Sequence, residues 1–507
     1  MKKLSPVFII SSVITLIFIV WGALSPKGLS TATSTVQTFL QGNFGWLYLT
    51  SATAFLVFLL YLAFSRFGRI KLGKDTDKPE FSTFTWLAMV FSAGMGIGLV
   101  FWGVAEPISH FHNPPFGKGE TADSAALAMR YSFFHWGFHA WAIYAITGLS
   151  IAYFAFRKGF KQVPSEILRP LFGNKVEGGL GRAVNVIFIM ATVFAISGPL
   201  GMGATQISGG ISYLTNIQNN FTTQIIVIVV VTILFTLSAK TGLERGIKYL
   251  SNTNVILAIF LLIFMFFTGP TTFILNLFTS AFADYIHNLP NMSLNQRPFE
   301  QSSWFKDWTV FYWAWWIAAA PFAGSFIARV SKGRTVREFV LGVLIVPSTF
   351  SILWFSVFGG TAVSLEMFNQ FGIKEIMDTQ GVEVALFAIL KELPFGTIIS
   401  FLAILLIGTF FITTADSGTF VLAMQSSRGN LNPSNLMKIT WGILQSLTAI
   451  ILLWSGGLGA IVSALIIIGF PLAIILILTI FSLMKSFKKE TIINPQKNLN
   501  EAKQKVV

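Results

Sequence analysis

Tryptophan and tyrosine side chains gather in two apolar stretches of the sequence. Trp136, Trp141 and Tyr144 stand in the first, and at about 100° per residue they share one broad face of a helix. The second stretch contains Trp308, Tyr312, Trp313, Trp315 and Trp316. Interfacial belts account for most membrane Trp and Tyr, but they explain Trp315 and Trp316 less well, because these stand further into their stretch. Converging aromatic faces predict a cage that binds a quaternary ammonium group by cation–π attraction.

Three glycines, Gly94, Gly96 and Gly98, stand close together in another apolar stretch. Glycine at this density weakens a helix and lets other groups approach its backbone. Loosened backbone at membrane depth is tolerated only where it is buried in protein or lines a cavity. The stretch therefore predicts the wall of a binding site inside a membrane protein.

Two adjacent hydroxyl groups, on Thr413 and Thr414, stand in a later apolar stretch near Asp416. Beside irregular backbone they could coordinate sodium, a hard cation that prefers oxygen. Threonine in a helix also bonds back to the carbonyl four residues earlier, so both interpretations remain open. Asp416 is an ionisable group at membrane depth and hence a functional candidate, although it could equally brace a cationic loop.

His135 and His139 stand four residues apart, a spacing that could present two imidazole rings to a metal or a haem. Other ligands are scarce, because the chain has five His and no Cys. We therefore expect these rings to pack or to form hydrogen bonds, and we expect no cofactor. The glycine-rich stretch lacks the Lys and Ser/Thr of a phosphate loop, which argues against ATP as the energy source.

Membrane-spanning helices must position these groups. The 507 residues are 54% hydrophobic and 11% charged, whereas a soluble protein is about 25% charged. Crossing about 30 Å of hydrocarbon takes roughly 20 apolar residues, and we expect twelve such spans. They centre near residues 7–24, 46–64, 84–105, 131–156, 183–214, 222–239, 252–268, 304–328, 339–363, 397–424, 438–455 and 459–484.

The net charge of +14 would suit nucleic acid, but the positions of the basic residues argue against such a partner. Most Lys and Arg lie in segments that alternate spans would leave on one side of the membrane. This asymmetry is the positive-inside rule, and it predicts a multi-pass protein of the cell inner (plasma) membrane with both termini in the cytoplasm. The basic tail, residues 488–507, is expected to meet anionic lipids there.

The eighth stretch resembles the third in being interrupted, since it contains Pro321 and Gly324. Two interrupted spans at corresponding places indicate a transporter with two inverted repeats, here spans 3–7 and 8–12. Glycine and proline are also common in ordinary membrane helices, so an ordinary helix without a repeat remains the alternative interpretation.

One integral membrane domain, residues 1–507, is expected to contain all of these parts. Its parts are two peripheral helices and a loop (1–80), repeat 1 (81–270), an amphipathic interfacial helix and loop (271–303), repeat 2 (304–487) and the basic tail (488–507). Within Thr271–Leu289 apolar residues recur at Ile274, Phe278 and Phe282, which suits a helix in the membrane interface or an ordinary extracellular loop helix.

The sequence resembles the betaine/choline/carnitine transporter family over nearly its whole length, most closely its bacterial glycine betaine carriers. The matching runs are Ala93–Gly98 with Trp102 and Glu106-Pro107, His135–Trp141, Trp308–Trp316 and Pro321–Glu338. The resemblance implies the fold of sodium-coupled neurotransmitter transporters, with two inverted five-helix repeats, two extra N-terminal helices and often a homotrimer.

The resemblance also implies the site residues. An aromatic box matches Trp136, Trp141, Tyr144 and Trp316, with Trp315 nearby. A sodium site matches the carbonyls of Ser92, Met95 and Phe410 and the hydroxyls of Thr413 and Thr414. Some relatives carry another Trp where this chain has Ala319, which makes this wall less aromatic.

We therefore expect a sodium-coupled importer of glycine betaine that serves osmotic protection, and not an enzyme. The trimethylammonium would enter the cage, and its carboxylate would meet the backbone at Gly94, Met95, Gly96 and Gly98. The alternatives are a carrier of choline, carnitine or proline betaine, a sodium-independent exchanger, a redox enzyme that uses His135 and His139, or a channel.

Overall fold

Helices and their connecting loops make up the described molecule. The computed structural model describes residues 4–94, 96–215, 217–241, 244–299 and 302–490, without the side chains of 92–94, 238–241 and 244–248. Within these residues no strand forms, and the only β-type pairing is an isolated bridge between Lys71 and Thr335. Nine helices of this part of the chain are long and apolar enough to cross a membrane, as expected for an all-α membrane protein.

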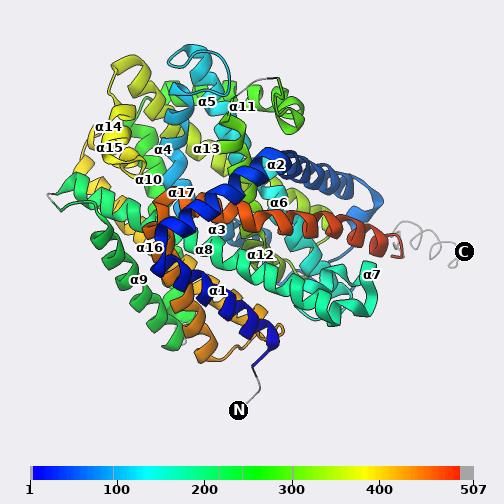
Figure 1. Ribbon diagram of the computed structural model, residues 1–507. Helices are drawn as coiled ribbons and strands as arrows, with labels where there is room; N and C mark the ends of the chain where they lie inside the picture. Colours follow the sequence, from blue (N-terminus) through cyan, green and yellow to red (C-terminus); the bar gives the residue numbers. More distant parts are fainter. Residues whose placement is uncertain (1–3, 95, 216, 242–243, 300–301, 491–507) are drawn as a thin grey trace, which may run out of the picture.

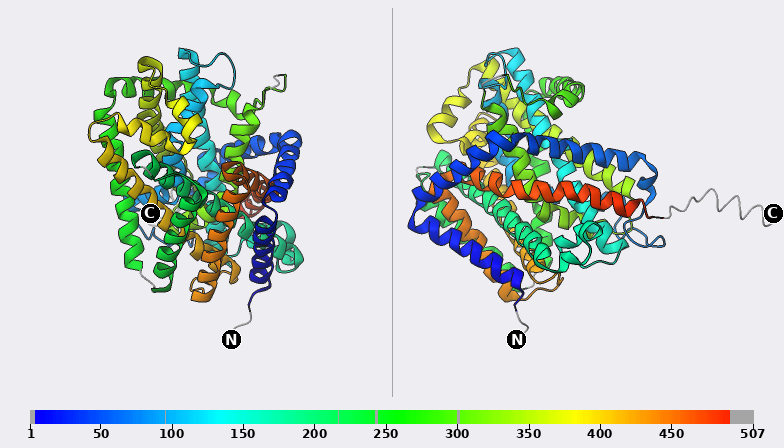
Figure 2. Two further views of the ribbon diagram at one scale, coloured as in Figure 1. Left: turned by 60° about the vertical axis from the view of Figure 1, so that its left-hand side comes forward. Right: turned by 45° about the vertical axis from the view of Figure 1, so that its right-hand side comes forward.

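The two N-terminal helices, α1 (Pro6–Leu24) and α2 (Pro26–Phe64), pack against α17 (Asn435–Phe487). The hydroxyl of Tyr48 in α2 donates a hydrogen bond to the carbonyl of Ile466 at 2.6 Å. Figure 2 shows α2 running beside the red, C-terminal half of α17. These helices therefore cover one side of the bundle and take no part in the cavity described below.

The helix α17 is too long for one membrane crossing. Its 53 residues extend about 80 Å at 1.5 Å per residue, against about 30 Å of hydrocarbon. Gly456 and Gly457 have non-helical backbone angles, and the φ of Gly457 is +59°, which glycine adopts without steric cost. The bend at these residues separates the segments expected as spans 438–455 and 459–484.

The glycine-rich stretch divides the third expected span into α3 (Thr83–Gly94) and α4 (Ile97–His112). Gly96 precedes α4 in an extended conformation and no side chain caps this end. The first N–H groups of a helix have no intrahelical partner, so the start of α4 presents free donors. The predicted interruption is thus present.

A second break, which the sequence analysis missed, divides the fourth expected span. Here α5 (Ala122–Trp136) ends and α6 (Phe138–Ala152) begins, with the non-helical Gly137 between them. A Cβ on Gly137 would lie 2.5 Å from the carbonyl oxygen of Phe133, so only glycine fits this turn. Our placement of Trp136 and Trp141 on one continuous helical face was therefore wrong.

The expected interruption at Pro321 is also wrong, because α12 (Phe311–Val330) continues through this residue. A π-helical turn, η5 (Lys306–Val310), precedes it. Proline removes one backbone hydrogen bond, but packing against neighbouring helices lets a membrane helix continue through it. Such packing exists here, since a Cβ on Gly324 would lie 2.8 Å from the side chain of Thr147 in α6.

The expected amphipathic segment forms α11 (Thr271–Leu294). Its buried side runs through Ile274, Ala281 and Tyr285, whereas Phe282 is exposed. The predicted apolar face included Phe282, whereas the buried face is rotated toward Ala281 and Tyr285. This is the side of α11 that packs against α5 and α13. An ion pair joins Arg130 of α5 to Asp284 of α11.

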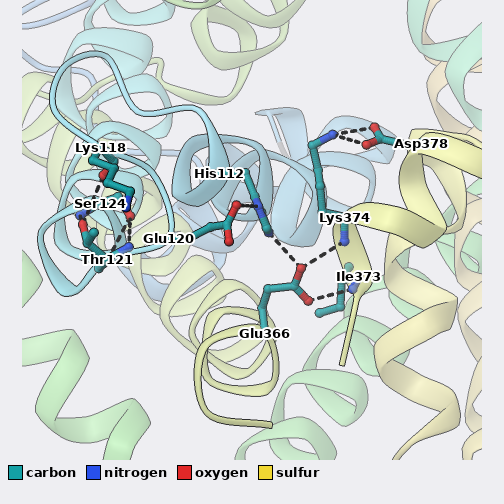
Figure 3. Close-up of polar contacts among 9 residues, drawn as sticks. All are labelled: His112, Lys118, Glu120, Thr121, Ser124, Glu366, Ile373, Lys374 and Asp378. Carbon is teal, nitrogen blue, oxygen red and sulfur yellow. Dashed lines mark hydrogen bonds and ion pairs between the residues drawn. The ribbon is translucent and has the colours of Figure 1, made fainter. Parts of the chain in front are cut away.

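Hydrogen bonds tie the C-terminal end of α4 to α13 (Val336–Asn369) and α14 (Ile373–Gln380), as Figure 3 shows. His112 Nε2 lies 2.8 Å from Glu366 Oε1, and the N–H of Ile373 donates to Glu366 Oε2 at 2.7 Å. The end of α4 opposite the glycine break is thereby fixed.

The other helices complete the bundle seen in Figure 1. They are α7 (Arg169–Phe172), α8 (Gly179–Leu214), α9 (Phe221–Thr241), α10 (Glu244–Thr268), α15 (Ala385–Lys391), α16 (Gly396–Ser426), and the short turns η1 (Arg66–Arg69), η2 (Tyr153–Arg157), η3 (Pro164–Leu168), η4 (Gly173–Glu177) and η6 (Val382–Val384).

Candidate functional site

A cavity of about 180 Å³ lies beside the start of α4, between helices α5, α6, α10, α12 and α16. Its walls combine aromatic rings, exposed backbone and hydroxyl groups. Among the residues that line it are Trp136, Tyr144, Trp315, Trp316, Gly96, Gly98, Phe410, Thr413 and Thr414. The structure therefore brings together most of the residues that the sequence analysis singled out, from four separate stretches of the chain.

The aromatic rings stand at steep angles to one another. Trp316 lies 5.5 Å from Trp136 at 82° and 4.8 Å from Tyr144 at 58°, measured between ring centroids and ring planes. Trp315 stands 6.0 Å from Trp136 at 83°. Trp141 does not line the cavity but is buried behind it, with its ring 5.7 Å from that of Tyr144. These rings thus pack against one another at steep angles and together form the aromatic side of the cavity.

The start of α4 forms the wall next to these rings. Gly96, Ile97 and Gly98 all line the cavity. The N-terminus of a helix carries a partial positive charge and free N–H donors, so it favours a negative group nearby. A Cβ on Gly98 would lie only 2.6 Å from the ring of Trp315, so this glycine lets the rings approach the backbone.

The hydroxyl side of the cavity belongs to α16. A Cβ added to Gly96 would lie 3.8 Å from Thr414 Oγ1. The helix α16 therefore lies against the break between α3 and α4. The hydroxyl of Thr413 lies 3.0 Å from the carbonyl of Thr409 and 3.1 Å from that of Phe410. The simple back-bonding of threonine therefore occurs at position 413.

Some residues expected at the ion site fall outside the described part. Met95 is not described, nor is the side chain of Ser92. Gly94 is the last residue of α3, so it stands directly before the break.

A larger cavity of about 660 Å³ adjoins the first, and Phe322, Phe326 and Ser417 line both. Its lining includes three basic residues, Lys161, Arg329 and Lys438, and three acidic ones, Glu80, Glu166 and Asp416. The three shared residues therefore stand between the smaller cavity and the larger one.

The two histidines do not share a site. His135 Nδ1 lies 2.7 Å from Glu106 Oε1, whereas His139 Nε2 lies 3.0 Å from the hydroxyl of Ser293. Gly137 breaks the helix between them, which separates their directions. As expected, both rings form hydrogen bonds and pack in the core.

Comparison with known proteins gives the family directly. A model described as the betaine/carnitine/choline family transporter matches residues 6–492. The chain belongs to this family. It is 49% identical over 493 residues to the glycine betaine transporter OpuD of Bacillus subtilis (strain 168), which covers 97% of this chain and 96% of that protein.

Further relatives in the betaine/carnitine/choline transporter family differ in their substrates. A probable glycine betaine transporter of Desulfitobacterium hafniense (strain Y51) is 43% identical over 492 residues, 96% of this chain and 98% of that protein. An ectoine/hydroxyectoine transporter of Virgibacillus pantothenticus is 42% identical over 488 residues, 96% of this chain and 97% of that protein. The chain is therefore a multi-pass membrane transporter and not an enzyme.

Two residues of the site escaped the sequence analysis. Asn254 of α10 lines the cavity and donates from Nδ2 to Thr413 Oγ1 at 3.0 Å. Glu106 is buried behind Trp136 and accepts a hydrogen bond from its indole N–H at 2.8 Å. A signal existed for Glu106, because an ionisable side chain inside a membrane span is a functional candidate by default.

Proposed function

We propose that this transporter imports glycine betaine by secondary active transport coupled to Na⁺, and that it serves osmotic protection. The observation that carries the proposal is the aromatic cage beside the start of α4. The names of two relatives, OpuD and the transporter of Desulfitobacterium hafniense, agree with this substrate.

The cage suits the trimethylammonium end of the substrate. This group cannot donate a hydrogen bond, so a polar pocket gains little from it, whereas cation–π attraction is worth about 2 kcal/mol or more once desolvated. Trp136, Tyr144, Trp315 and Trp316 would hold it, with Trp141 behind them.

The start of α4 suits the carboxylate end of the substrate. Betaine is a zwitterion, and its carboxylate would meet the free N–H groups and the positive end of the helix dipole near Gly96 and Gly98. Choline lacks this carboxylate, so the same site should bind it less well.

The coupling ion would bind between α16 and the break. Carbonyls and hydroxyls are suitable sodium ligands at unwound helices. The hydroxyls of Thr413 and Thr414 and the Phe410 carbonyl would act on one side, and the carbonyls of Ser92 and Met95 on the other. The contact between Thr414 and the backbone at Gly96 supports this pairing of elements.

We propose twelve spans with two inverted repeats, spans 3–7 and 8–12, which rock against each other. Both termini would face the cytoplasm of an inner-membrane protein, and the larger cavity would be the inward exit. A homotrimer is a further part of this proposal.

Uptake of radiolabelled glycine betaine into proteoliposomes tests the function. An inward Na⁺ gradient should drive saturable, uphill uptake, and an equal K⁺ gradient should not. Uptake that never exceeds equilibrium would indicate a channel, and equal uptake with K⁺ would remove sodium coupling. An excess of choline, carnitine or proline betaine as competitor ranks the alternative substrates.

A further inference from the structure

Glu106 lies in the layer of side chains directly behind the cage. Its carboxylate is completely buried. Trp136 Nε1 donates to Glu106 Oε2 at 2.8 Å, and the hydroxyl of Tyr312 donates to the same oxygen at 2.5 Å. Trp136 lines the cavity, and the Tyr312 ring stacks on Trp315 at 6.2 Å and 22°. One carboxylate thus connects α4 to two aromatic walls of the cage, on α5 and α12.

Two histidines lie within hydrogen-bond distance of the other carboxylate oxygen of Glu106. His135 Nδ1 lies 2.7 Å and His110 Nε2 3.2 Å from Oε1, and His135 Nε2 lies 3.0 Å from Thr309 Oγ1. When both rings are neutral and donate to Glu106, the hydroxyl of Thr309 donates to His135 Nε2 and every contact is satisfied. An ionised Glu106 then accepts two hydrogen bonds at each oxygen, which suits a carboxylate that can only accept.

The charge on Glu106 has no permanent counter-charge in the described part of the chain, where no Lys or Arg pairs with it. A buried charge is costly unless another charge or a set of hydrogen bonds balances it. A cation in the cage would be that balancing charge, with the indole ring of Trp136 between the two. A carboxylate at the N–H edge of an indole also polarises the ring, which makes its face more attractive to a cation.

We propose that Glu106 is a positioning and specificity-determining residue of the transport site. It holds Trp136 and Tyr312 in place and supplies, through these rings, the negative potential that selects a cationic head group over a neutral group of the same shape. The proposal rests on the proposed function, in which the cage receives the trimethylammonium of glycine betaine.

The test compares glycine betaine with 3,3-dimethylbutanoate, in which carbon replaces the quaternary nitrogen and the shape is unchanged. The dissociation constants of both probes are measured by calorimetry on the purified full-length protein in Na⁺. The quantity of interest is their ratio. Glu106→Gln keeps the size of the side chain and removes the charge, so it should lower the preference for betaine about tenfold while binding of the isostere is kept.

Two further variants separate charge from packing. Glu106→Asp keeps the charge on a shorter side chain and should retain more of the preference than Glu106→Gln. Glu366→Gln makes the same chemical change at the far end of α4, where Glu366 bonds to His112, and should leave the ratio unchanged. If Glu106 had a role in packing alone, Glu106→Gln would weaken the binding of both probes equally. An unchanged ratio of the two dissociation constants in this variant would overturn the proposal.

A variant that leaves the carboxylate in place covers the case in which Glu106→Gln does not fold. Replacing Trp136 by 3-benzothienylalanine keeps the bicyclic ring and removes only the N–H that Glu106 accepts. The same fall in the ratio supports the proposal, and an unchanged ratio contradicts it. Failure of the wild type to bind betaine would instead overturn the proposed function, and this inference with it.

Discussion

The indole rings of Trp136 and Trp316 stand 5.5 Å apart and almost perpendicular, at 82°, so α5 and α12 each contribute one wall to the same cavity. The two residues are far apart in the sequence and meet only because α12 packs beside the α5–α6 break. The two rings touch each other edge to face, so a trimethylammonium in the cavity would lie against this pair and not between its members. The binding energy should therefore depend on aromatic character at these positions.

Trp316 should be essential for tight binding. Trp316→Leu removes the π-face but keeps an apolar side chain, and should weaken the apparent affinity for betaine uptake by about 2 kcal/mol, roughly thirty-fold. Trp316→Phe and Trp316→Tyr should keep part of the affinity. Uptake kinetics in proteoliposomes measure this, and equal constants for the Leu and Phe variants would remove Trp316 from the cage.

Gly98 should tolerate no side chain. In Gly98→Ala the new Cβ would lie 2.6 Å from Trp315 and 3.2 Å from Trp136, so at least one ring must move. Such overpacking costs about 1–3 kcal/mol, and we expect betaine affinity to fall roughly ten-fold or more. Gly408→Ala is the control, because no atom lies within 4 Å of its added Cβ. An affinity for Gly98→Ala as high as that of the control would contradict the close approach.

Thr413 and Thr414 should govern the sodium requirement. Replacing both by Ala should raise the Na⁺ concentration for half-maximal uptake several-fold, with little loss of membrane insertion. Thr414→Ser keeps the hydroxyl and serves as the control, whereas Thr414→Val keeps the shape without it. Sodium activation curves give the result, and an unaltered curve for the double variant would rule out this ion site.

Glu490 should make stability depend on pH below about pH 4.5. Burial alone would raise its pKa, but hydrogen bonds from Lys158, Tyr153 and Arg157 outweigh burial and lower the pKa below its usual value of 4.5. A lowered folded-state pKa contributes stability above the unfolded-state pKa, and this contribution is lost as pH falls through the folded-state pKa.

The melting temperatures of wild type and Glu490→Gln therefore test the Glu490 contacts. The wild type should be more stable at pH 7, and the difference should shrink as the pH falls from about 4.5. A difference that stays constant down to the lowest pH at which the protein survives would show that the charge of Glu490 does not stabilise the fold.

The basic tail should regulate transport rather than perform it. Residues 491–507 lie outside the described part, and Lys497, Lys503 and Lys505 make them cationic. Each such charge near an anionic leaflet contributes about 1 kcal/mol, and internal salt screens it. Deleting residues 491–507, which spares Glu490, should preserve uptake but flatten its dependence on external osmolality. A truncated carrier that responds to osmolality like the wild type would leave the tail without this role.

The sequence could predict which residues line the cavity better than the course of the helices that carry them. Trp316 and Thr414 were recognisable because aromatic and hydroxyl groups stand out inside apolar spans. The break at Gly137 depends on a close approach by the carbonyl of Phe133, and the continuity at Pro321 depends on packing against α6. Neither condition can be read from neighbouring residues.

Glu106 shows the same limit at the site itself. Its type and position inside a membrane span could have made it a candidate, but its partners are not visible in the sequence. His110 is 4 residues away, whereas Trp136 is 30 and Tyr312 is 206 residues away. Only the folded bundle brings these donors onto one carboxylate.

The most direct test of the account is equilibrium binding of radiolabelled glycine betaine to the purified protein, in Na⁺ and in K⁺ at equal ionic strength, for the wild type and Trp316→Leu. The account predicts saturable binding by the wild type in Na⁺, much weaker binding in K⁺, and roughly thirty-fold weaker binding by Trp316→Leu in Na⁺. Wild-type binding that is absent in Na⁺, or that is unaffected both by the ion and by the loss of the Trp316 ring, would contradict it.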